Sequence, residues 1–345
     1  MTDSMIEARG LTKRFRHAVK DPGLAGAVKH LVRPRYRQQV AVDGIDLRVE
    51  RGEAIAYVGP NGAGKSTTIK MLTGILTPSD GYLRVNGLVP HRQRIDNAKQ
   101  IGVVFGQRTQ LWWDIALSES FALLRDIYEI PERRYRERMA RFSEILGLDE
   151  FLDQPVRKLS LGQRVRGDLA AALLHDPAIV YLDEPTIGLD IGARDRIRQF
   201  VRELNTEHAT TVVLTSHDLD DIEGICQRII VIDQGRVLYD GGLSAFKDEF
   251  ARERAIHFQL QEPLTGLDEL RAALEPAAVE DSGGPLHLVV RFDRFERRGG
   301  ELAARVMEAA EVVDFTVEEP SVEQVIRRVY ARQLRLVAAE QTAED

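Results

Sequence analysis

A phosphate-binding loop is the feature of this 345-residue sequence that most restricts what it can fold into. Residues 59–66, the P-loop, have the sequence Gly-Pro-Asn-Gly-Ala-Gly-Lys-Ser and match the pattern G-x-x-x-x-G-K-S/T. They follow the apolar run 54–58 and open a helical pattern at Lys65. Glycines let backbone N–H groups surround a phosphate, and the helix start adds a positive partial charge. The loop therefore predicts a nucleotide site on a strand–loop–helix unit of an α/β domain.

Residue types within the P-loop suggest individual roles. Lys65 supplies a cation for the β- and γ-phosphates, and the Ser66 hydroxyl is suited to binding Mg²⁺. The alternative is an incidental glycine-rich turn, but every fixed position of the pattern is matched in the expected context. The residues expected to contact the nucleotide here are Gly59, Pro60, Asn61, Gly62, Ala63, Gly64, Lys65, Ser66 and Thr67.

Short apolar runs alternate with helical patterns over the first two thirds of the chain. Continuous apolar runs are typical of strands buried on both faces, and this alternation indicates an α/β domain with a mainly parallel sheet. Strands are expected at 54–58, 101–105, 179–182, 211–214 and 229–232. Helices are expected at 65–74, 118–128, 132–146, 161–175 and 192–205. Residues 6–13 and 45–49 are expected to form an antiparallel flank.

The length favours two domains of unequal size. We expect a nucleotide-binding domain over residues 1–242, with a helical subdomain at about 108–177, and an accessory domain over 251–335. Gly241-Gly242 and the charged stretch 247–254 mark the boundary. The order strand, helix, strand, strand, helix, strand predicts a small α+β split-βαβ domain. An amphipathic helix from Pro320-Ser321 and a flexible tail at 336–345 complete this expectation.

Two adjacent acids end the apolar run 179–182, at the sheet edge where ligands bind in open α/β sheets. Because neighbouring strand residues point to opposite faces, Asp183 and Glu184 can take different roles. Asp183 can hold Mg²⁺ through water, and Glu184 can act as the base for the water that attacks the γ-phosphate. His217 follows another apolar run and can contact the same phosphate. A solvated acidic turn and an ordinary loop histidine are the alternatives.

Composition argues against several other classes of protein. The net charge of −7 gives no general reason to expect a nucleic-acid or anionic-membrane partner. No apolar stretch approaches the length of a membrane span, and no secretory signal is visible. The single cysteine, Cys226, suits a reducing compartment. We therefore expect a cytosolic protein, in which any membrane function depends on another chain.

The motifs that follow the P-loop resemble, in order, those of ABC-type ATPases. Leu159-Ser160-Leu161-Gly162-Gln163 and the helix after it resemble the family's signature motif. Gln107 resembles the Q-loop glutamine, 188–190 the D-loop and His217 the H-loop histidine. Leu161 departs from the family pattern, which more often has glycine there. Ser160 and Gly162, which would contact phosphate, are retained. The departure at Leu161 therefore bears on the details of that contact and not on the resemblance to the family.

This resemblance implies an ATP site shared between two copies of the chain. Ser160, Gly162 and Gln163 of one copy would complete the ATP site of the other in a head-to-tail dimer. Glu184, His217 and Gln107 would be the catalytic residues, and Ser66, Gln107 and Asp183 would hold Mg²⁺. The family also stacks an aromatic residue on adenine, for which Phe15 and Tyr36 are the two candidates.

The resemblance also implies a membrane partner. In this family the segment after the Q-loop faces the coupling helices of a permease, so Trp112 and Trp113 are expected to dock there, with core packing as the alternative. The whole chain resembles ATPase subunits of ABC-2-type exporters of drugs, antibiotics or viologens, which act at the cytoplasmic face of the membrane. The basic insertion 17–39 resembles that of polysaccharide and teichoic-acid exporters, or it is a solvated loop.

Two other functions compete with ATP-driven export. One is a soluble ABC-type ATPase acting on nucleic acid or ribosomes, which usually carries a long coiled coil or a second ATPase domain. The other is a P-loop kinase or GTPase, which the signature motif and His217 disfavour. The C-terminal domain contains no recognisable catalytic group, and by resemblance it is accessory or regulatory.

Overall fold

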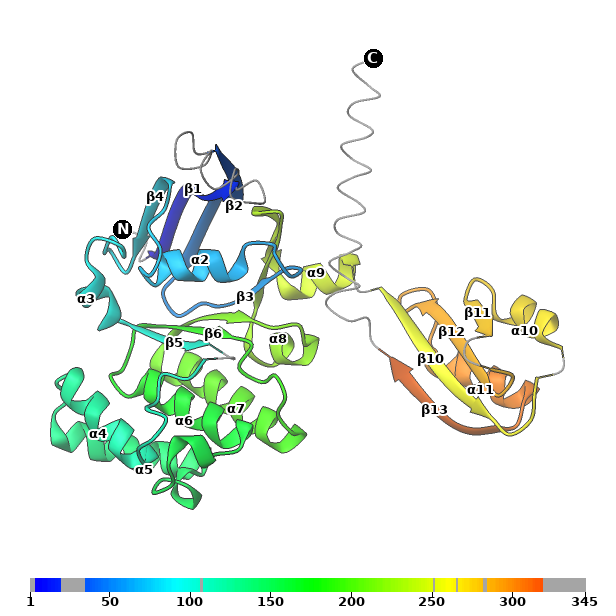
Figure 1. Cartoon of the computed structure of the whole chain (residues 1–345). Coiled ribbons are helices and arrows are strands. Elements are labelled where there is room, and N and C mark those ends of the chain that lie inside the picture. Colours follow the sequence, from blue (N-terminus) through cyan, green and yellow to red (C-terminus); the bar gives the residue numbers. More distant parts are fainter. Residues whose placement is uncertain are drawn as a thin grey trace, which may run out of the picture. The chain divides into compact units, whose positions relative to one another are not determined.

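The computed structural model describes residues 4–19, 35–105, 108–250, 252–264, 266–281 and 284–318. It divides into two compact units, Met1–Gly241 and Gly242–Asp345 (Figure 1). Gln107, residues 20–34 of the expected insertion, the helix expected from Pro320 and the tail 336–345 lie outside the described residues. Within the described residues, no helix combines the length and apolarity that crossing a bilayer requires.

A six-stranded sheet forms the centre of the first unit, in the order β5-β6-β7-β3-β8-β9. Its strands are β3 (Ala54–Val58), β5 (Ile101–Phe105), β6 (Ile179–Asp183), β7 (Thr211–Thr215), β8 (Arg228–Asp233) and β9 (Arg236–Gly242). The pairs β5–β6, β6–β7, β7–β3 and β3–β8 are parallel. This confirms the parallel core predicted from the apolar runs. Strand β9, which has no buried apolar run, was not expected.

An antiparallel sheet in the order β2-β1-β4 flanks this core; the pair β1–β2 was predicted, whereas β4 was not. Its strands are β1 (Ser4–Val19), β2 (Arg35–Glu50) and β4 (Asp80–Val85). The expected strand limits at 6–13 and 45–49 were too short. Backbone pairing continues outward to Val19 and Arg35, into the polar segment interpreted as an insertion. Strand pairing satisfies backbone groups whatever the side chains are, so hydrophobic alternation alone did not reveal this extension.

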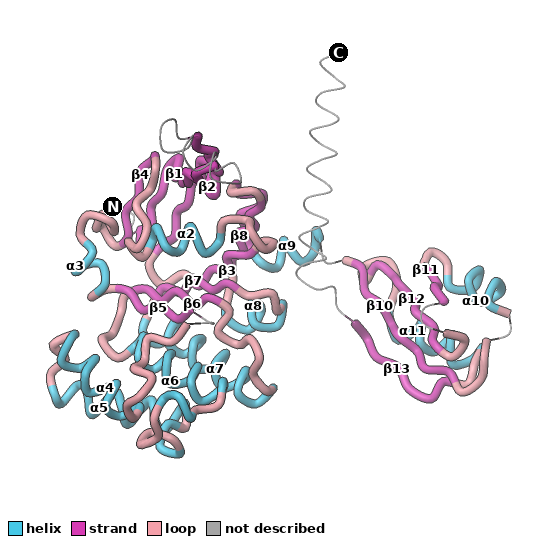
Figure 2. Tube along the Cα trace, viewed as in Figure 1, coloured by secondary structure: helices cyan, strands magenta, loops and turns pink. Residues whose placement is uncertain are grey.

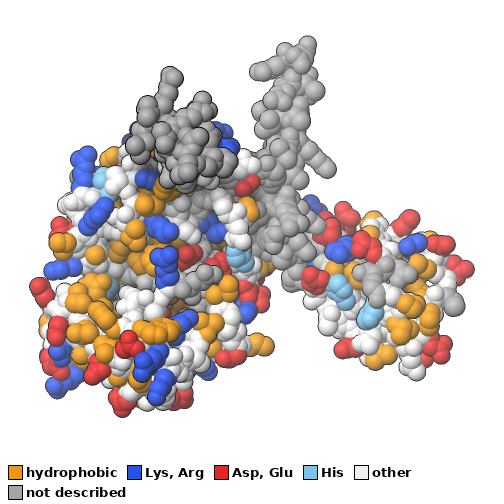
Figure 3. All heavy atoms as spheres, viewed as in Figure 1, with side chains coloured by type: hydrophobic (Ala, Val, Ile, Leu, Met, Phe, Trp, Pro, Cys, Tyr) orange, Lys and Arg blue, Asp and Glu red, His pale blue; other side chains and the backbone are white. Residues whose placement is uncertain are grey.

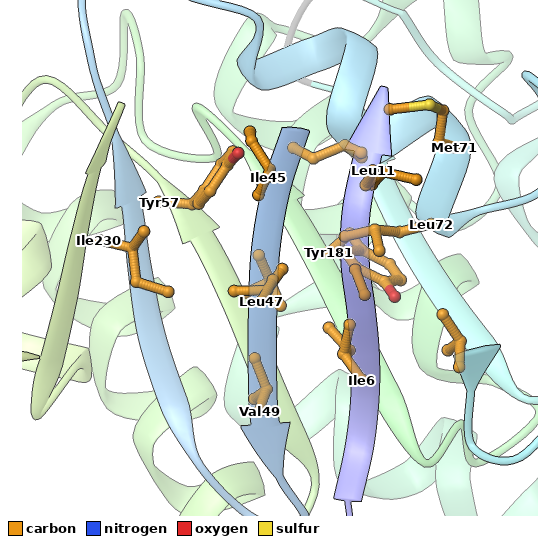
Figure 4. Packing of buried hydrophobic residues seen from close by; sticks show 14 of the residues in the cluster. Ile6, Leu11, Ile45, Leu47, Val49, Tyr57, Met71, Leu72, Tyr181 and Ile230 are labelled. Carbon is orange, nitrogen blue, oxygen red and sulfur yellow. The ribbon is translucent and has the colours of Figure 1, made fainter. Parts of the chain in front are cut away.

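The main apolar core joins the two sheets to helix α2 (Lys65–Leu72). Tyr57, Tyr181 and Ile230 of the parallel sheet lie in it together with Leu72 of α2 (Figure 4), and Ile69 of α2 belongs to the same cluster. All five side chains are at most 2% exposed. Full burial of a large apolar side chain stabilises a fold by about 1.5–3 kcal/mol. The strand before the P-loop and the helix after it are thus both anchored in this core.

Helices cover the other face of the parallel sheet (Figures 1 and 2). The main ones are α4 (Leu117–Ile127), α5 (Glu132–Leu146), α6 (Leu161–Leu173), α7 (Ile191–His208) and α8 (Leu219–Ile225). Short elements α3 (Arg94–Ala98), η1 (Leu148–Glu150) and η2 (Val156–Lys158) complete the unit. The predicted starts of α5 and α6 agree with the structure. Helices α3 and α8 were missed because one or two turns carry too few residues to show a helical period.

The second unit is a four-stranded antiparallel sheet in the order β11-β12-β10-β13. Its elements are α9 (Leu243–Phe250), β10 (Glu253–Leu260), α10 (Leu267–Leu274), β11 (Ala278–Asp281), β12 (His287–Asp293), α11 (Gly299–Ala309) and β13 (Val312–Glu318). Helices α10 and α11 share one core with β10, β11 and β12. This is the arrangement that the split-βαβ prediction requires. Helix α9 was not expected, because its charged residues were interpreted as a boundary.

Candidate nucleotide site

The P-loop follows a backbone path that only glycine permits at two positions. A Cβ atom on Gly59 would lie 2.1 Å from the carbonyl oxygen of Ile232. One on Gly64 would lie 2.5 Å from the carbonyl oxygen of Ala41, and Gly64 has a φ of +107°. Side chains at these positions would push the loop away from its neighbours and distort the start of α2. The sequence pattern thus has a direct steric cause.

Lys65 lies at the start of α2, with its side chain directed back along the loop. Its Nζ donates to the carbonyl oxygens of Gly59 (2.5 Å) and Pro60 (3.2 Å). Burial lowers the pKa of Lys65, while the nearby Glu184 and Asp183 carboxylates raise it. The ammonium therefore lies within electrostatic range of both predicted acids, although they come from a distant part of the sequence.

Asp183 and Glu184 lie at the carboxyl end of β6, where β7 fixes both of them. The Thr215 hydroxyl donates to Asp183 Oδ1 at 2.6 Å, and the Glu184 amide donates to the Thr215 carbonyl at 3.0 Å. Glu184 adopts a φ of +54°, which is uncommon for a residue with a side chain. Such conformations persist where the surroundings fix them, often at functional sites. The side chains of the two acids are separated because the strand ends between them, and not by the alternation of a strand alone.

Burial raises the pKa of the Glu184 carboxyl to about 7. The Asp183 carboxylate raises it further, while the His217 backbone N–H and Lys65 act in the opposite direction. His217 Nε2 lies 3.2 Å from Glu184 Oε1, without the alignment of a hydrogen bond. A carboxyl group with a pKa near neutrality can both accept and release a proton at physiological pH. The arrangement is therefore suited to acid–base chemistry.

The oxygen ligands at this edge fit Mg²⁺. Asp183 offers a carboxylate that Thr215 orients, and Ser66 offers an exposed hydroxyl in the first turn of α2. Carboxylate and hydroxyl oxygens are the donors that this hard cation prefers, usually together with substrate phosphates and water. The third predicted ligand, Gln107, lies outside the described residues.

The predicted signature residues form the start of α6. Ser160 caps this helix: its Oγ accepts from the Gln163 amide at 3.2 Å, and its own amide donates to Gln163 Oε1 at 2.9 Å. Gln163, expected to contact nucleotide, thus uses its side chain to cap the helix. Ser160 itself is exposed. Leu161, the departure from the family pattern, packs on the D-loop, where a Cβ on Gly188 would meet its Cδ2 at 2.8 Å.

The two candidates for adenine stacking lie at different distances along the β1–β2 ribbon. Phe15 pairs with Gln39, two residues from Ala41, whose carbonyl borders the P-loop. Tyr36 pairs with Ala18 farther along the ribbon and is 60% exposed. Lys13 Nζ lies 5.3 Å from the centre of the Phe15 ring. The register therefore favours Phe15 over Tyr36.

A buried carboxylate that the sequence reasoning missed connects the loops around Glu184 and His217. Asp221 of α8 is 0% exposed and accepts hydrogen bonds from the hydroxyls of Thr186 and Ser216. Arg198 Nε of α7 also donates to it, at 2.5 Å. Thr186 is two residues beyond Glu184, and Ser216 immediately precedes His217. In the sequence, Asp221 is only an acid within an otherwise amphipathic turn. That pattern does not indicate which side chains the fold places next to it.

A second missed carboxylate holds the segment that follows the Q-loop. Asp168 of α6 is 6% exposed and accepts from the Thr109 hydroxyl at 2.8 Å and the Gln110 amide at 3.0 Å. Burial raises the pKa of Asp168 to about 6, against the effect of these two hydrogen bonds. The adjacent Trp112 and Trp113 are 40% and 49% exposed, so neither is a core residue. The segment that carries both tryptophans is therefore attached to the signature helix.

Comparison with known proteins agrees with this geometry. The family model described as ABC transporter matches residues 42–187. The chain is 33% identical over 205 residues to the ABC transporter ATP-binding protein NatA of Bacillus subtilis, covering 59% of this chain and 83% of that protein. It is 33% identical over 293 residues to the daunorubicin resistance ATP-binding protein DrrA3 of Streptomyces coeruleorubidus, covering 84% and 91%.

A solved structure with the same fold is an ATP-binding cassette in a dimeric, post-hydrolysis state bound to ADP and Pi. The TM-score is 0.58 and the identity 26%, and the match covers 69% of this chain and 99% of that one.

Proposed function

Because this chain belongs to the ABC transporter ATP-binding proteins and is an ATPase of that family, we propose that it powers export of a substrate through a separate ABC-2-type permease. Two similar proteins are named for daunorubicin resistance and Nod factor export. In this proposal the cassette comprises residues 1–242, and residues 251–335 are accessory. The protein then works at the cytoplasmic face of the membrane.

One observation carries the catalytic part of the proposal: Lys65, Asp183, Glu184 and His217 meet at the carboxyl edge of a single parallel sheet. Lys65 and the P-loop amides bind the β- and γ-phosphates, and Phe15 stacks on adenine. Ser66 and Asp183, with Gln107, would hold Mg²⁺, which would supply positive charge against the phosphates during transfer. Glu184 orients and deprotonates the attacking water, and His217 contacts the γ-phosphate.

The second half of each ATP site comes from another copy of the chain. Ser160 is exposed at the start of a 13-residue helix, where backbone N–H groups and the helix dipole attract an anion. In the proposed dimer, Ser160 and Gly162 of one copy contact the γ-phosphate bound to Lys65 of the other, beside Gln163. Solved structures similar to this chain include dimeric cassettes. Hydrolysis removes the bridging phosphate and lets the two copies separate.

The permease docks at the exposed tryptophans and the neighbouring apolar surface of α4. Leu123 and Ile127 of α4 are 41% and 58% exposed, and Figure 3 shows apolar side chains gathered over this region of the first unit. Exposed tryptophans are frequent anchors in protein interfaces. Arg157 pairs with Asp114 at 2.9 Å and contributes a polar rim to the same surface.

Co-purification tests the transport assignment. The chain, produced together with a permease encoded by a neighbouring gene where one is present, should be recovered in complex with it from detergent extracts. Changing Trp112 and Trp113 together to Ala should remove the complex, whereas Ile95→Ala, which truncates a 76% exposed side chain on α3, should not. Recovery of an intact complex from the double variant would rule out this docking surface.

ATP hydrolysis tests the site itself. Glu184→Gln should lower turnover by about 10²–10⁴-fold, the usual contribution of a positioned acid–base group, and nucleotide binding should persist. Full turnover by this variant would remove Glu184 from the role of base.

A further inference from the structure

The outer strand of the C-terminal sheet has an apolar face that the helices of its domain leave open. Among the residues that the structure describes, β13 pairs with β10 alone and forms the outer strand of the sheet (Figure 1). Phe315 and Val317 are 41% and 52% exposed, and Val313, at a register shift between Asp314 and Val312, is 61% exposed. An outer strand with exposed apolar side chains is a template on which another strand can pair.

This apolar face continues the core of the domain. In the register of the sheet, Phe315 lies opposite Phe258 and Val317 lies opposite Ile256, and both β10 residues are at most 1% exposed. The rings of Phe258 and Phe315 stack with their centres 5.9 Å apart. Residues opposite each other in an antiparallel pair share one face, so Phe315 and Val317 lie on the helix-covered side. Among the residues that the structure describes, the core therefore extends onto β13 and ends at an edge that no strand covers.

The sequence of β13 is self-complementary about Phe315. Val313-Asp314-Phe315-Thr316-Val317 alternates apolar and polar residues identically in both directions. Two such strands paired antiparallel about a twofold axis place Phe315 opposite Phe315 and Val313 opposite Val317. Asp314 then lies opposite Thr316, so no two acids face each other, and like charges directly opposite would be destabilising. Over these five positions a second copy of the same strand is a matching partner, whereas at the strand ends Val312 lies opposite Glu318.

We propose that the β13 strands of two copies pair antiparallel about Phe315, which joins two four-stranded sheets into one of eight strands. The contact uses the helix-covered side of both sheets and requires no nucleotide. It rests on the proposed function only in that both bring two copies of the chain together. The amide of Phe315 now donates to Asp314 Oδ1 at 2.8 Å, and pairing exchanges that bond for one across the strands.

The contact is weak by itself and gains strength from the proposed cassette dimer. Cross-strand apolar and aromatic pairs contribute only about 0.2–1 kcal/mol each. A seven-residue strand also offers less area than the roughly 1,000 Å² of a stable interface. Linking the two copies elsewhere makes pairing effectively intramolecular, at a local concentration of about millimolar. The strand pair thus adds to the contact between two copies that are already linked elsewhere.

Cysteine cross-linking of the full chain tests the exact register. Opposite residues in an antiparallel pair have Cβ atoms about 4.5–5.5 Å apart, within reach of a disulfide after small adjustment. Phe315→Cys should therefore form a disulfide-linked dimer under mild oxidation. Val313→Cys alone should not, because its own twofold mate lies four residues away along the strand, at more than about 10 Å. An equimolar mixture of Val313→Cys and Val317→Cys chains should cross-link.

The chain offers a low background for this experiment, because its single native cysteine, Cys226, is 4% exposed. If Phe315→Cys cross-links no better than Val313→Cys, the strand pairing is refuted. If Val313→Cys cross-links with itself as readily as with Val317→Cys, the contact is non-specific and the register is wrong.

The proposed function is measured separately, as ATP-dependent dimerisation of Glu184→Gln. Loss of that dimerisation while Phe315→Cys still cross-links counts against the proposed function alone. ATP-dependent dimerisation of Glu184→Gln without cross-linking of Phe315→Cys counts against the strand pairing alone.

Discussion

Replacing Glu184 by glutamine should stabilise the protein in a pH-dependent way. The pKa of this carboxyl is about 7 in the folded chain, against an ordinary value of 4.5, mainly because of burial. A raised folded pKa means that ionisation is unfavourable in the fold. The cost is absent below about pH 4.5, grows as pH rises and is complete above about pH 7. Glutamine has almost the same shape and carries no charge at any of these pH values.

The size of the effect follows from the two pKa values. Each tenfold change in a protonation equilibrium is worth about 1.4 kcal/mol, so full burial would give roughly 3 kcal/mol at pH 8. The Glu184 side chain is 22% exposed, and solvent screening reduces this to about 1–2 kcal/mol. For a domain of this size such a change raises Tm by about 2–6 °C.

Thermal unfolding at pH 5 and pH 8, without nucleotide and with EDTA, measures this directly. The Tm of Glu184→Gln should exceed that of the unchanged chain by several degrees at pH 8 and by much less at pH 5. Glu144→Gln, which neutralises an exposed carboxylate on α5, should show no such growth. A difference that is equal at the two pH values, or a destabilised variant at pH 8, would refute the burial argument.

Three further substitutions test other contacts. Thr186→Val removes the hydroxyl that donates to Asp221 and should lower ATP turnover by about 10–100-fold without weakening nucleotide binding. Thr186→Ser should retain activity. Equal turnover of the two variants would contradict a positioning role for the hydroxyl. Asp168→Ala should release the segment with both tryptophans and increase acrylamide quenching of their fluorescence, and unchanged quenching would show that the carboxylate does not hold it. Phe15→Ala should weaken ATP binding by about 1–3 kcal/mol and Tyr36→Ala should have little effect, with the opposite order assigning the stacking to Tyr36.

The sequence predicted local structure well where the pattern lies in consecutive residues. The P-loop and the acids at the end of β6 are local features, and the steric demands on Gly59 and Gly64 leave a visible pattern. The parallel core was equally accessible, because strands buried on both faces are continuously apolar. These are short-range signals that one sequence contains in full.

Prediction failed where contacts join distant segments. The structural role of Asp221 depends on Thr186 and Ser216, which the fold of β6, β7 and α8 brings next to it. Asp168 likewise depends on a partner 59 residues away. The outer parts of β1 and β2 are polar, so their pairing left no hydrophobic alternation to detect. In each case a backbone or side-chain hydrogen bond, which composition does not reveal, decides the structure.

Complementation between two inactive variants tests most directly whether one ATP site uses residues from two chains. Lys65→Ala disables the phosphate-binding side, and Ser160→Arg disables the signature side, so each variant alone should lack ATP-dependent dimerisation and turnover. In a mixture, dimers with one chain of each kind contain one site in which Lys65 and Ser160 are both intact. We predict that mixing restores ATP-dependent dimerisation and part of the turnover. A mixture as inactive as its components, although both variants are folded and the unchanged chain is active, would contradict the shared site.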